Sequence, residues 1–231
     1  MAGKKKQIAI PGSRYYDGRK KQKWKIDGGV IATPCEKVVD EWLDKWDTQP
    51  GYKEQESALE LLFQHLCPEN KNLDHILIKA CTLNDFYSTN IYKVFDVAKI
   101  IKDMDIDRAF SSNNRNAGLV DELNKTVKKE TGREIYSFAS KYFSHHRPDI
   151  YPIYDSYVDM LLKFYRDMKK EETVVPFEFK DKDLTEYQTF CMVIDKFKES
   201  FSLQKYNAKQ IDKFLWQVGK FYFPRYEEVE E

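Results

Sequence analysis

Hydrophobic side chains recur every three or four positions along most of the chain after about residue 34. In each segment this spacing places the apolar side chains on one face, which predicts amphipathic helices. Pro50 and Gly51 are expected to separate the first two of these helices. The expected helices cover residues 35–47, 54–67, 73–83, 91–104, 119–131, 133–146, 155–168, 185–201 and 207–221.

The N-terminal segment follows a different pattern, because Pro11, Pro34 and several glycines interrupt any periodicity. Such punctuation argues for irregular structure or a short ribbon, and IDGGVIAT at residues 26–33 is the only strand-like candidate in it. We therefore expect an all-α protein. An irregular basic arm would occupy residues 1–34, and a helical domain would occupy residues 35–231.

The bulk composition limits the size and class of that domain. The chain has 231 residues, of which 42% are hydrophobic, so it can bury a core as one domain or as two small helical lobes that share a cleft. No apolar run approaches the roughly 18 residues of a membrane span, and the Lys-rich N-terminus lacks the apolar stretch of a secretion signal. These features predict a soluble cytoplasmic protein with no membrane partner.

The four cysteines give no sign of a metal or redox centre. They are far apart and form no CxxC pair, which argues against a zinc knuckle, an iron–sulfur cluster or a disulfide framework. We expect core thiols in a reducing compartment, and no metal or cofactor. The cysteines are Cys35, Cys67, Cys81 and Cys191.

Charge is distributed unevenly along the chain. The sequence has 38 basic and 38 acidic residues, yet the first 25 residues hold nine basic residues and a single acidic one. With Tyr15, Tyr16 and Trp24 among them, this arm could follow DNA phosphates by charge and stack its rings on bases. A solvated tail explains the same composition equally well. The candidate contacts to the DNA backbone in the arm are Lys20, Lys21 and Lys23.

One aspartate stands where a helix must restart. In HHRPDIYPIYDSYVDMLL, Pro148 and Pro152 lack the amide hydrogen and disfavour helical geometry before them, so Asp155 begins the next helix. An aspartate in that place is most often a cap. The apolar, aromatic connector before it would also hold the carboxylate in one direction, which suits stabilisation of a developing cation or activation of water. Asp155 either only caps its helix or caps it while facing a ligand.

These residues resemble a known family. The run SFASKYFSHHRPDIYPIYDSYVDMLL resembles the part of the helix-hairpin-helix DNA glycosylase superfamily, which includes endonuclease III and the 8-oxoguanine glycosylases, where a small-residue helix leads through a proline-containing connector to an aspartate. Asp155 falls on the family's catalytic aspartate. IKACTLNDFYSTNIYKVFDVAKII is similar to the family's first lobe, and together the two stretches cover roughly residues 75–165. The resemblance implies a two-lobed helical bundle, with lobe one at about 35–110 plus 184–231 and lobe two at about 111–183.

The resemblance also implies an activity. Such a protein binds double-stranded DNA that carries a damaged or modified base, rotates that base out of the duplex and hydrolyses its N-glycosidic bond. Members that also cut the strand have a lysine early in the small-residue helix, near Tyr136 or Ser137 here, so the chemistry implied is monofunctional. Lys141, fourteen residues before Asp155, is the lysine that this helix does offer. Of the family's Gly-x-Gly hairpin only Gly132 remains.

Further candidates are expected to contact DNA. Tyrosines around Asp155 could line the base pocket or belong to an aromatic core. The turn LNDFYSTN could fill the gap left by a flipped base or could be a simple capped turn. His145 and His146 have no third ligand at metal spacing and would end their helix, where positive charge suits the helix dipole. The substrate-binding candidates are Asn84, Tyr87, Asn90, Tyr151, Tyr154 and Tyr157, and Arg133 and Arg147 are candidate contacts to the DNA backbone.

Three classes of function stay open at this stage. The first is a monomeric, monofunctional DNA glycosylase associated with the nucleoid, acting in base excision repair or against modified phage DNA. The second is a non-catalytic nucleic-acid-binding module that reuses the fold. The third is a protein-interaction module without affinity for DNA. The base on which a glycosylase would act depends on residues that are distant along the chain.

Overall fold

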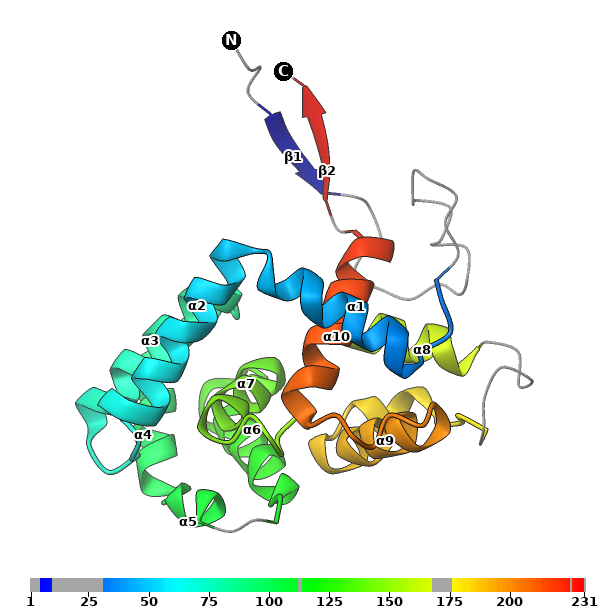
Figure 1. Ribbon diagram of the computed structural model, residues 1–231. Helices are drawn as coiled ribbons and strands as arrows, with labels where there is room; N and C mark the ends of the chain where they lie inside the picture. Colours follow the sequence, from blue (N-terminus) through cyan, green and yellow to red (C-terminus); the bar gives the residue numbers. More distant parts are fainter. Residues whose placement is uncertain (1–4, 10–30, 112–113, 168–175, 225, 231) are drawn as a thin grey trace.

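The all-α prediction is confirmed for the helical domain. The computed structural model describes residues 5–9, 31–111, 114–167, 176–224 and 226–230, and the helices it contains form a single packed body (Figure 1). The α-helices are α1 (Glu36–Asp47), α2 (Pro50–Glu60), α3 (Leu73–Tyr87), α4 (Val94–Asp103), α5 (Asp107–Phe110), α6 (Ala117–Thr131), α7 (Tyr136–His146), α8 (Ser156–Arg166), α9 (Tyr187–Ser200) and α10 (Ala208–Tyr222). A π-helix, η2 (Leu61–Leu66), continues α2, and a 3₁₀ turn, η4 (Asp181–Leu184), precedes α9.

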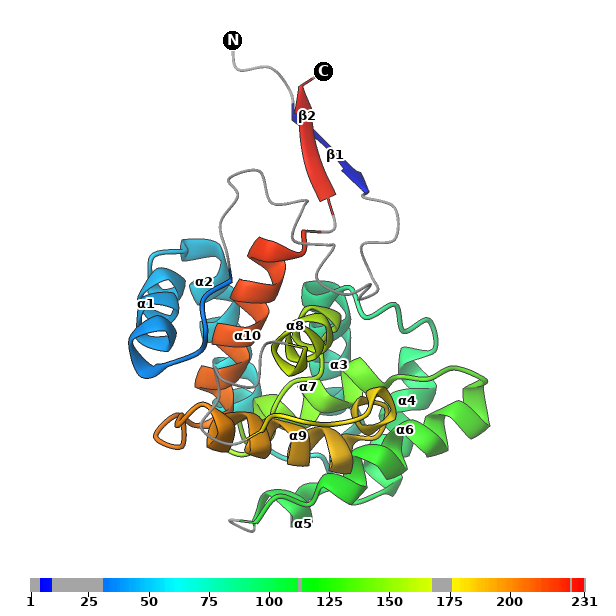
Figure 2. The same ribbon diagram turned by 90° about the vertical axis from the view of Figure 1, so that its right-hand side faces the viewer.

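The N-terminal arm is not wholly irregular. Strand β1 (Lys5–Ala9) pairs antiparallel with strand β2 (Tyr226–Glu230), in a register that places Lys5 opposite Glu230 (Figures 1 and 2). The expected strand at 26–33 is wrong for its described part, residues 31–33, which form no strand. A strand needs a partner to satisfy its backbone groups, and here the partner comes from the far end of the chain. Residues 10–30, with Lys20, Lys21 and Lys23, lie outside the described residues.

Two helix boundaries differ from the expected ones. Pro50 does not separate helices but occupies the first turn of α2, where its missing amide hydrogen costs nothing. Helix α3 runs on to Tyr87, four residues beyond its expected end, before Ser88 turns into the left-handed region with φ of 47°. Gly132 ends α6 with φ of 78°, and Asn207 forms a capping box with Gln210 at the start of α10.

Helix α10 lies between two other helices. It packs against α1 on one side and α8 on another, while α6 packs against both α7 and α9, and α3 contacts α4 and α7 (Figures 1 and 2). At the crossing of α8 and α10, Gly219 lies so close to the backbone of Tyr157 that a Cβ atom would stand 2.6 Å from the Tyr157 carbonyl oxygen. The predicted division into two lobes stays a prediction, since α8 of the second lobe packs closely on α10 of the first.

A buried polar network fixes α7 against α3. Lys79 Nζ donates to Asn70 Oδ1 at 2.7 Å and lies 3.2 Å from His146 Nε2. The Tyr142 hydroxyl donates to the same Asn70 oxygen, and Asp107 accepts both amide groups of Asn70. Burial lowers the pKa of Lys79 to about 8, although Asp107 opposes the shift, and burial lowers the pKa of His146 well below its ordinary value. His146 is therefore a neutral acceptor that joins α7 to this network.

The depressed pKa of Lys79 predicts a pH dependence of stability. Between about pH 8 and 10.5 the folded protein releases the Lys79 proton while the unfolded chain still binds it, so this group makes folding more favourable as pH rises. Relative to Lys79→Met, the wild type should gain on the order of 3 kcal/mol in unfolding free energy across that range. Urea unfolding of both proteins from pH 7.5 to 10.5 measures the difference. A difference that stays constant with pH would contradict the assignment.

Candidate functional site

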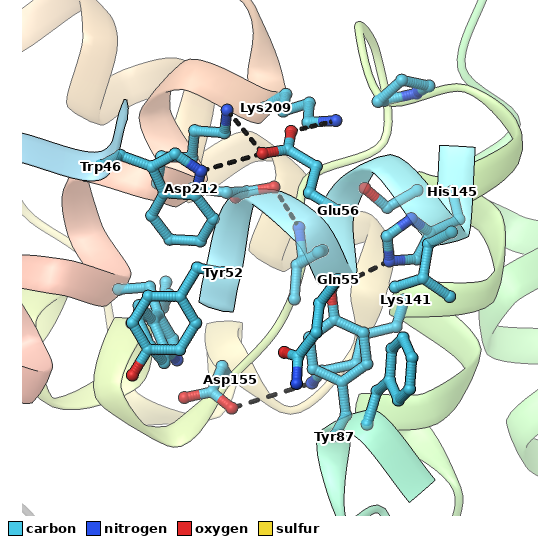
Figure 3. A pocket seen from close by; sticks show the side chains of 18 residues that line it. Trp46, Tyr52, Gln55, Glu56, Tyr87, Lys141, His145, Asp155, Lys209 and Asp212 are labelled. Carbon is cyan, nitrogen blue, oxygen red and sulfur yellow. Dashed lines mark hydrogen bonds and ion pairs between the residues drawn. The ribbon is translucent and has the colours of Figure 1, made fainter. Parts of the chain in front are cut away.

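A cavity of about 150 Å³ lies where α1, α2, α3, α7, α8 and α10 meet. Its lining is mainly apolar and aromatic, with a few charged groups among the rings (Figure 3). A cavity of that size has room for one aromatic ring of the size of benzene. Segments that are far apart in the sequence build it, since α2, the end of α3, the α7–α8 connector and α10 each contribute side chains.

Asp155 lines this cavity and also caps its own helix. Its Oδ1 atom accepts a hydrogen bond from the amide of Tyr157 at 2.9 Å, as expected of a residue that begins a helix. Its Oδ2 atom lies 3.7 Å from Nζ of Lys141 (Figure 3), and the side chain keeps 20% of its surface exposed. Each carboxylate oxygen thus has a separate task, one in the cap and one toward the cavity.

Lys141 is held in place by several acceptors. Its Nζ donates to Oγ of Ser137 at 2.6 Å and to the carbonyl oxygen of Tyr154 at 3.3 Å, and it lies 5.2 Å from the centre of the Tyr87 ring. Only 3% of the side chain is exposed. These contacts suit a fixed ammonium group, so Lys141 supplies positive charge beside Asp155.

A neutral histidine lies across the cavity from Asp155. Burial, with the charges on Lys209 and Lys141, lowers the pKa of His145 to about 3, so its imidazole is uncharged near neutral pH. Its Nε2 atom shares a hydrogen bond of 2.9 Å with the hydroxyl group of Tyr87 (Figure 3). The expectation of positive charge from His145 and His146 at the end of α7 is therefore wrong. Instead, Nε2 of Gln64 in η2 donates to the carbonyl oxygens of both histidines, at 2.5 and 3.0 Å.

Three aromatic rings form one wall of the cavity. Trp46 stacks on Tyr52 with 5.5 Å between ring centres, and Trp216 meets both rings edge-on at 5.9 and 5.1 Å. The three come from α1, α2 and α10. The helical pattern of the sequence gave no sign that the three rings come together, because they belong to three different helices.

Glu56 ties this wall to α10. It forms ion pairs with Lys209 and, at 2.9 Å, with Lys213, and it accepts a hydrogen bond from the indole nitrogen of Trp46. Burial disfavours its charge, yet the two lysines hold the pKa of the Glu56 carboxyl below its usual value. Sequence reasoning missed this group, because Glu56 and its lysine partners are more than 150 residues apart.

Asp212 is a further carboxyl group in the lining. Its Oδ2 accepts a hydrogen bond from the amide of Ile153 at 2.8 Å, whereas its Oδ1 is buried without a partner among the described residues. Burial raises the pKa of Asp212 well above its ordinary value, against the opposing effects of the Ile153 amide and of the charges on Lys141 and Lys209. Its position in the apolar pattern of α10 gave no signal of a role.

The predicted tyrosines beside Asp155 do not line the cavity. Tyr151 has 0% of its surface exposed, and its hydroxyl accepts a hydrogen bond from the amide of Asn116. The Tyr154 hydroxyl donates to Asp159, and the ring of Tyr157 packs edge-on against Trp216, behind the wall. These contacts agree with the aromatic-core alternative, and a contact of any of the three tyrosines with a base stays a prediction.

Of the three predicted turn residues, one lines the cavity and two do not. Tyr87 lines the cavity, as described above. The side chain of Asn84 holds its own turn together, with Oδ1 accepting from Thr89 Oγ1 and the amide of Ile91. Asn90 donates to the carbonyl oxygen of Ser88 and lies outside the lining. Of these candidates, only Tyr87 is brought to the site.

The two predicted arginines lie away from the cavity lining. The exposed Arg133 places its guanidinium 4.5 Å from the centre of the Tyr92 ring. Arg147 donates to the carbonyl oxygen of Phe110 at 2.8 Å and pairs with Asp149 at 3.2 Å. A contact of either residue with DNA phosphates stays a prediction.

Comparison with known proteins gives limited similarity. A family model described as "HI_0787_N: N-terminal domain" matches residues 38–150. A protein of Haemophilus influenzae (strain ATCC 51907 / DSM 11121 / KW20 / Rd) described as "Uncharacterized protein" is 38% identical over 143 residues, which is 62% of this chain and 65% of that protein. The chain therefore matches less than two thirds of that relative's length. No solved structure matches the chain.

The family match covers only part of the cavity lining. Residues 38–150 include Glu56, Tyr87, Lys141 and His145, whereas Asp155 and all of α10 lie beyond the match.

Within the described part of the chain, no group of three or more potential ligands is placed to hold a metal ion. None of the described helices combines the length and apolar character needed to cross a membrane.

Proposed function

We propose that this protein is a monofunctional DNA glycosylase-like hydrolase, which rotates a damaged or modified base out of duplex DNA into the cavity and cleaves its N-glycosidic bond. The observation that carries the proposal is the pairing of Asp155 with Lys141 in the wall of an aromatic cavity with room for one ring. The resemblance of residues 137–162 to the glycosylase superfamily supports the same chemistry.

Asp155 performs the chemical step in this proposal. As the bond from the sugar to the base nitrogen breaks, its electron pair leaves with the base and positive charge develops on the sugar. The Asp155 carboxylate stabilises that charge. A water molecule forms the new bond to the anomeric carbon and transfers its proton to Asp155. The cap from Oδ1 to the Tyr157 amide keeps the carboxylate aimed during the reaction.

Lys141 supports a hydrolytic rather than a covalent mechanism. A lysine that attacks the sugar must be uncharged and able to approach it. Lys141 is 3% exposed, and its hydrogen bonds to Ser137 and to the carbonyl oxygen of Tyr154 fix its position, so it has little freedom to approach the sugar. In the proposal it holds the Asp155 side chain and leaves the strand intact.

The rings of the wall would receive the flipped base. Base–aromatic stacking contributes about 1–3 kcal/mol per base and tolerates different bases. Trp46, Tyr52 and Trp216 offer such a surface, and Tyr87 closes the cavity opposite them (Figure 3). Lys220 lies 4.9 Å from the Tyr52 ring on the exposed side of α10, where its charge can meet a phosphate.

A base-release assay tests the proposal. Duplex oligonucleotides that carry a panel of damaged or naturally modified bases are incubated with the protein and then treated with alkali, which breaks the strand at abasic sites. We expect strand breaks from at least one duplex with alkali and intact strands without it. The identity of the released base would indicate whether the protein acts in repair or against modified phage DNA.

Two other outcomes would replace the proposal. Salt-sensitive DNA binding without base release from any duplex would indicate a non-catalytic nucleic-acid-binding module. No DNA binding in a low-salt titration would favour a protein-interaction module.

A further inference from the structure

The fold uses only one of the two oxygens of Asp212. Four buried side-chain polar atoms in the described part of the chain have no hydrogen-bond partner, and they belong to Tyr136, Ser200, Asp212 and Gln217. Asp212 is the one of these four residues that lines the cavity. A buried polar group without a partner destabilises the fold, so a ligand that supplies the partner gains that free energy on binding.

The surroundings of Asp212 decide what Oδ1 can offer. Oδ2 accepts the Ile153 amide hydrogen, which requires a lone pair on that oxygen. Burial raises the pKa of the carboxyl well above its usual range, despite the nearby charges of Lys141 and Lys209. Burial therefore favours the protonated acid, and because Oδ2 accepts the Ile153 amide hydrogen, Oδ1 is the oxygen that can hold the acid hydrogen. A carboxylic acid kept neutral by an apolar site is an effective hydrogen-bond donor.

We propose that Asp212 recognises the ligand of the cavity as a hydrogen-bond donor, with Oδ1–H directed to an acceptor ring nitrogen of a nucleobase. That the ligand is a nucleobase rests on the proposed function. The cavity then contains three carboxyl groups with different tasks, as Glu56 pairs with lysines, Asp155 faces the sugar and Asp212 reads the base. A base without an acceptor at this position leaves Oδ1 unpaired and binds more weakly.

The test measures binding of free bases and needs no bond cleavage. Adenine, guanine, cytosine and uracil are each compared with deaza analogues in which one ring nitrogen is replaced by C–H. Fluorescence of Trp46 and Trp216 in the cavity wall reports the binding to the full chain. We expect the wild type to bind at least one base about tenfold more tightly than one of its deaza analogues.

Two substitutions test whether Asp212 acts as a hydrogen-bond donor. Asp212→Leu removes the donor and should abolish the preference, with about tenfold weaker binding of the parent base. Asp212→Asn should keep the preference, because its amide oxygen can accept from Ile153 while its NH₂ group donates from the position of Oδ1. Circular dichroism checks that both variants fold. The comparison of bases with their deaza analogues in the wild type does not depend on the variants.

The inference and the proposed function can fail separately. Equal binding of every base and its analogues, no binding of any base, a preference that survives in Asp212→Leu or one that is lost in Asp212→Asn would each overturn the donor role. A preference without base release from any duplex would keep the donor role and remove the glycosylase. Base release without a preference would do the reverse.

Discussion

Asp155→Asn should reduce base release about 1,000-fold while the protein stays folded and binds DNA. Asparagine caps a helix about as well as aspartate, so the hydrogen bond to the Tyr157 amide and the start of α8 are retained. In the proposed mechanism this change removes the charge that stabilises the sugar and accepts the proton, and losses of about 10² to 10⁴ are typical of such groups. Single-turnover base release measures the effect, with fluorescence anisotropy for DNA binding and thermal unfolding for stability.

Asp159→Asn is the matched control. Asp159 lies one turn further along α8, is similarly shielded with 15% of its side chain exposed, and pairs with Lys163 at 2.8 Å outside the cavity. The same chemical change there should leave base release within about threefold of the wild type. Full activity in Asp155→Asn, or an equal loss in both variants, would remove the proposed role of Asp155.

Gly219→Ala should destabilise the protein by about 2 kcal/mol and impair base release as well. Alanine is the better helix former, and by that measure alone the change would stabilise α10. The added Cβ would, however, stand 2.6 Å from the carbonyl oxygen and 3.0 Å from the carbonyl carbon of Tyr157, which are backbone atoms of α8. Overpacking of this kind typically costs 1–3 kcal/mol. Because the amide of Tyr157 is the partner of Asp155, a shift of α8 also moves the Asp155 carboxylate.

Gly118→Ala provides the comparison for this change. Gly118 also lies in a helix, but the nearest atom to an added Cβ there is Oδ1 of Asn116 at 3.7 Å, an ordinary contact. This variant should be as stable as the wild type or up to about 1 kcal/mol more stable. Urea unfolding at fixed pH measures both variants. If Gly219→Ala proved as stable as Gly118→Ala, the close packing of α8 against α10 would not constrain the site.

Local signals in the chain were enough for the helices and for one feature of the site. The period of apolar positions located α1, α7 and α10, and Pro148 with Pro152 explained why a helix ends and restarts at Asp155. Capping chemistry depends on residues within a turn of each other, so the caps at Asp155, Asn207 and Gly132 could be predicted without any knowledge of the fold.

Tyrosine side chains show where this local reasoning failed. Tyr151, Tyr154 and Tyr157 flank Asp155 in the sequence, but each directs its ring into the core or behind the cavity wall. Two of the rings that line the cavity come from distant segments. Trp46 is more than 100 residues from Asp155 along the chain, and Trp216 lies on a different helix, α10. Side chains of successive residues point in different directions around a helix or turn, whereas a cavity is lined by side chains that packing brings together from distant segments.

The sequence by itself determined that the chain forms amphipathic helices and that a carboxylate begins the helix after the proline connector. Only the tertiary structure decided what this carboxylate faces. The pairing of Asp155 with Lys141, the neutral state of His145 and the unpartnered oxygen of Asp212 all depend on the approach of α2, α7 and α10. Burial and charge at the site arise from contacts between distant segments, and those contacts leave no periodic trace along the chain.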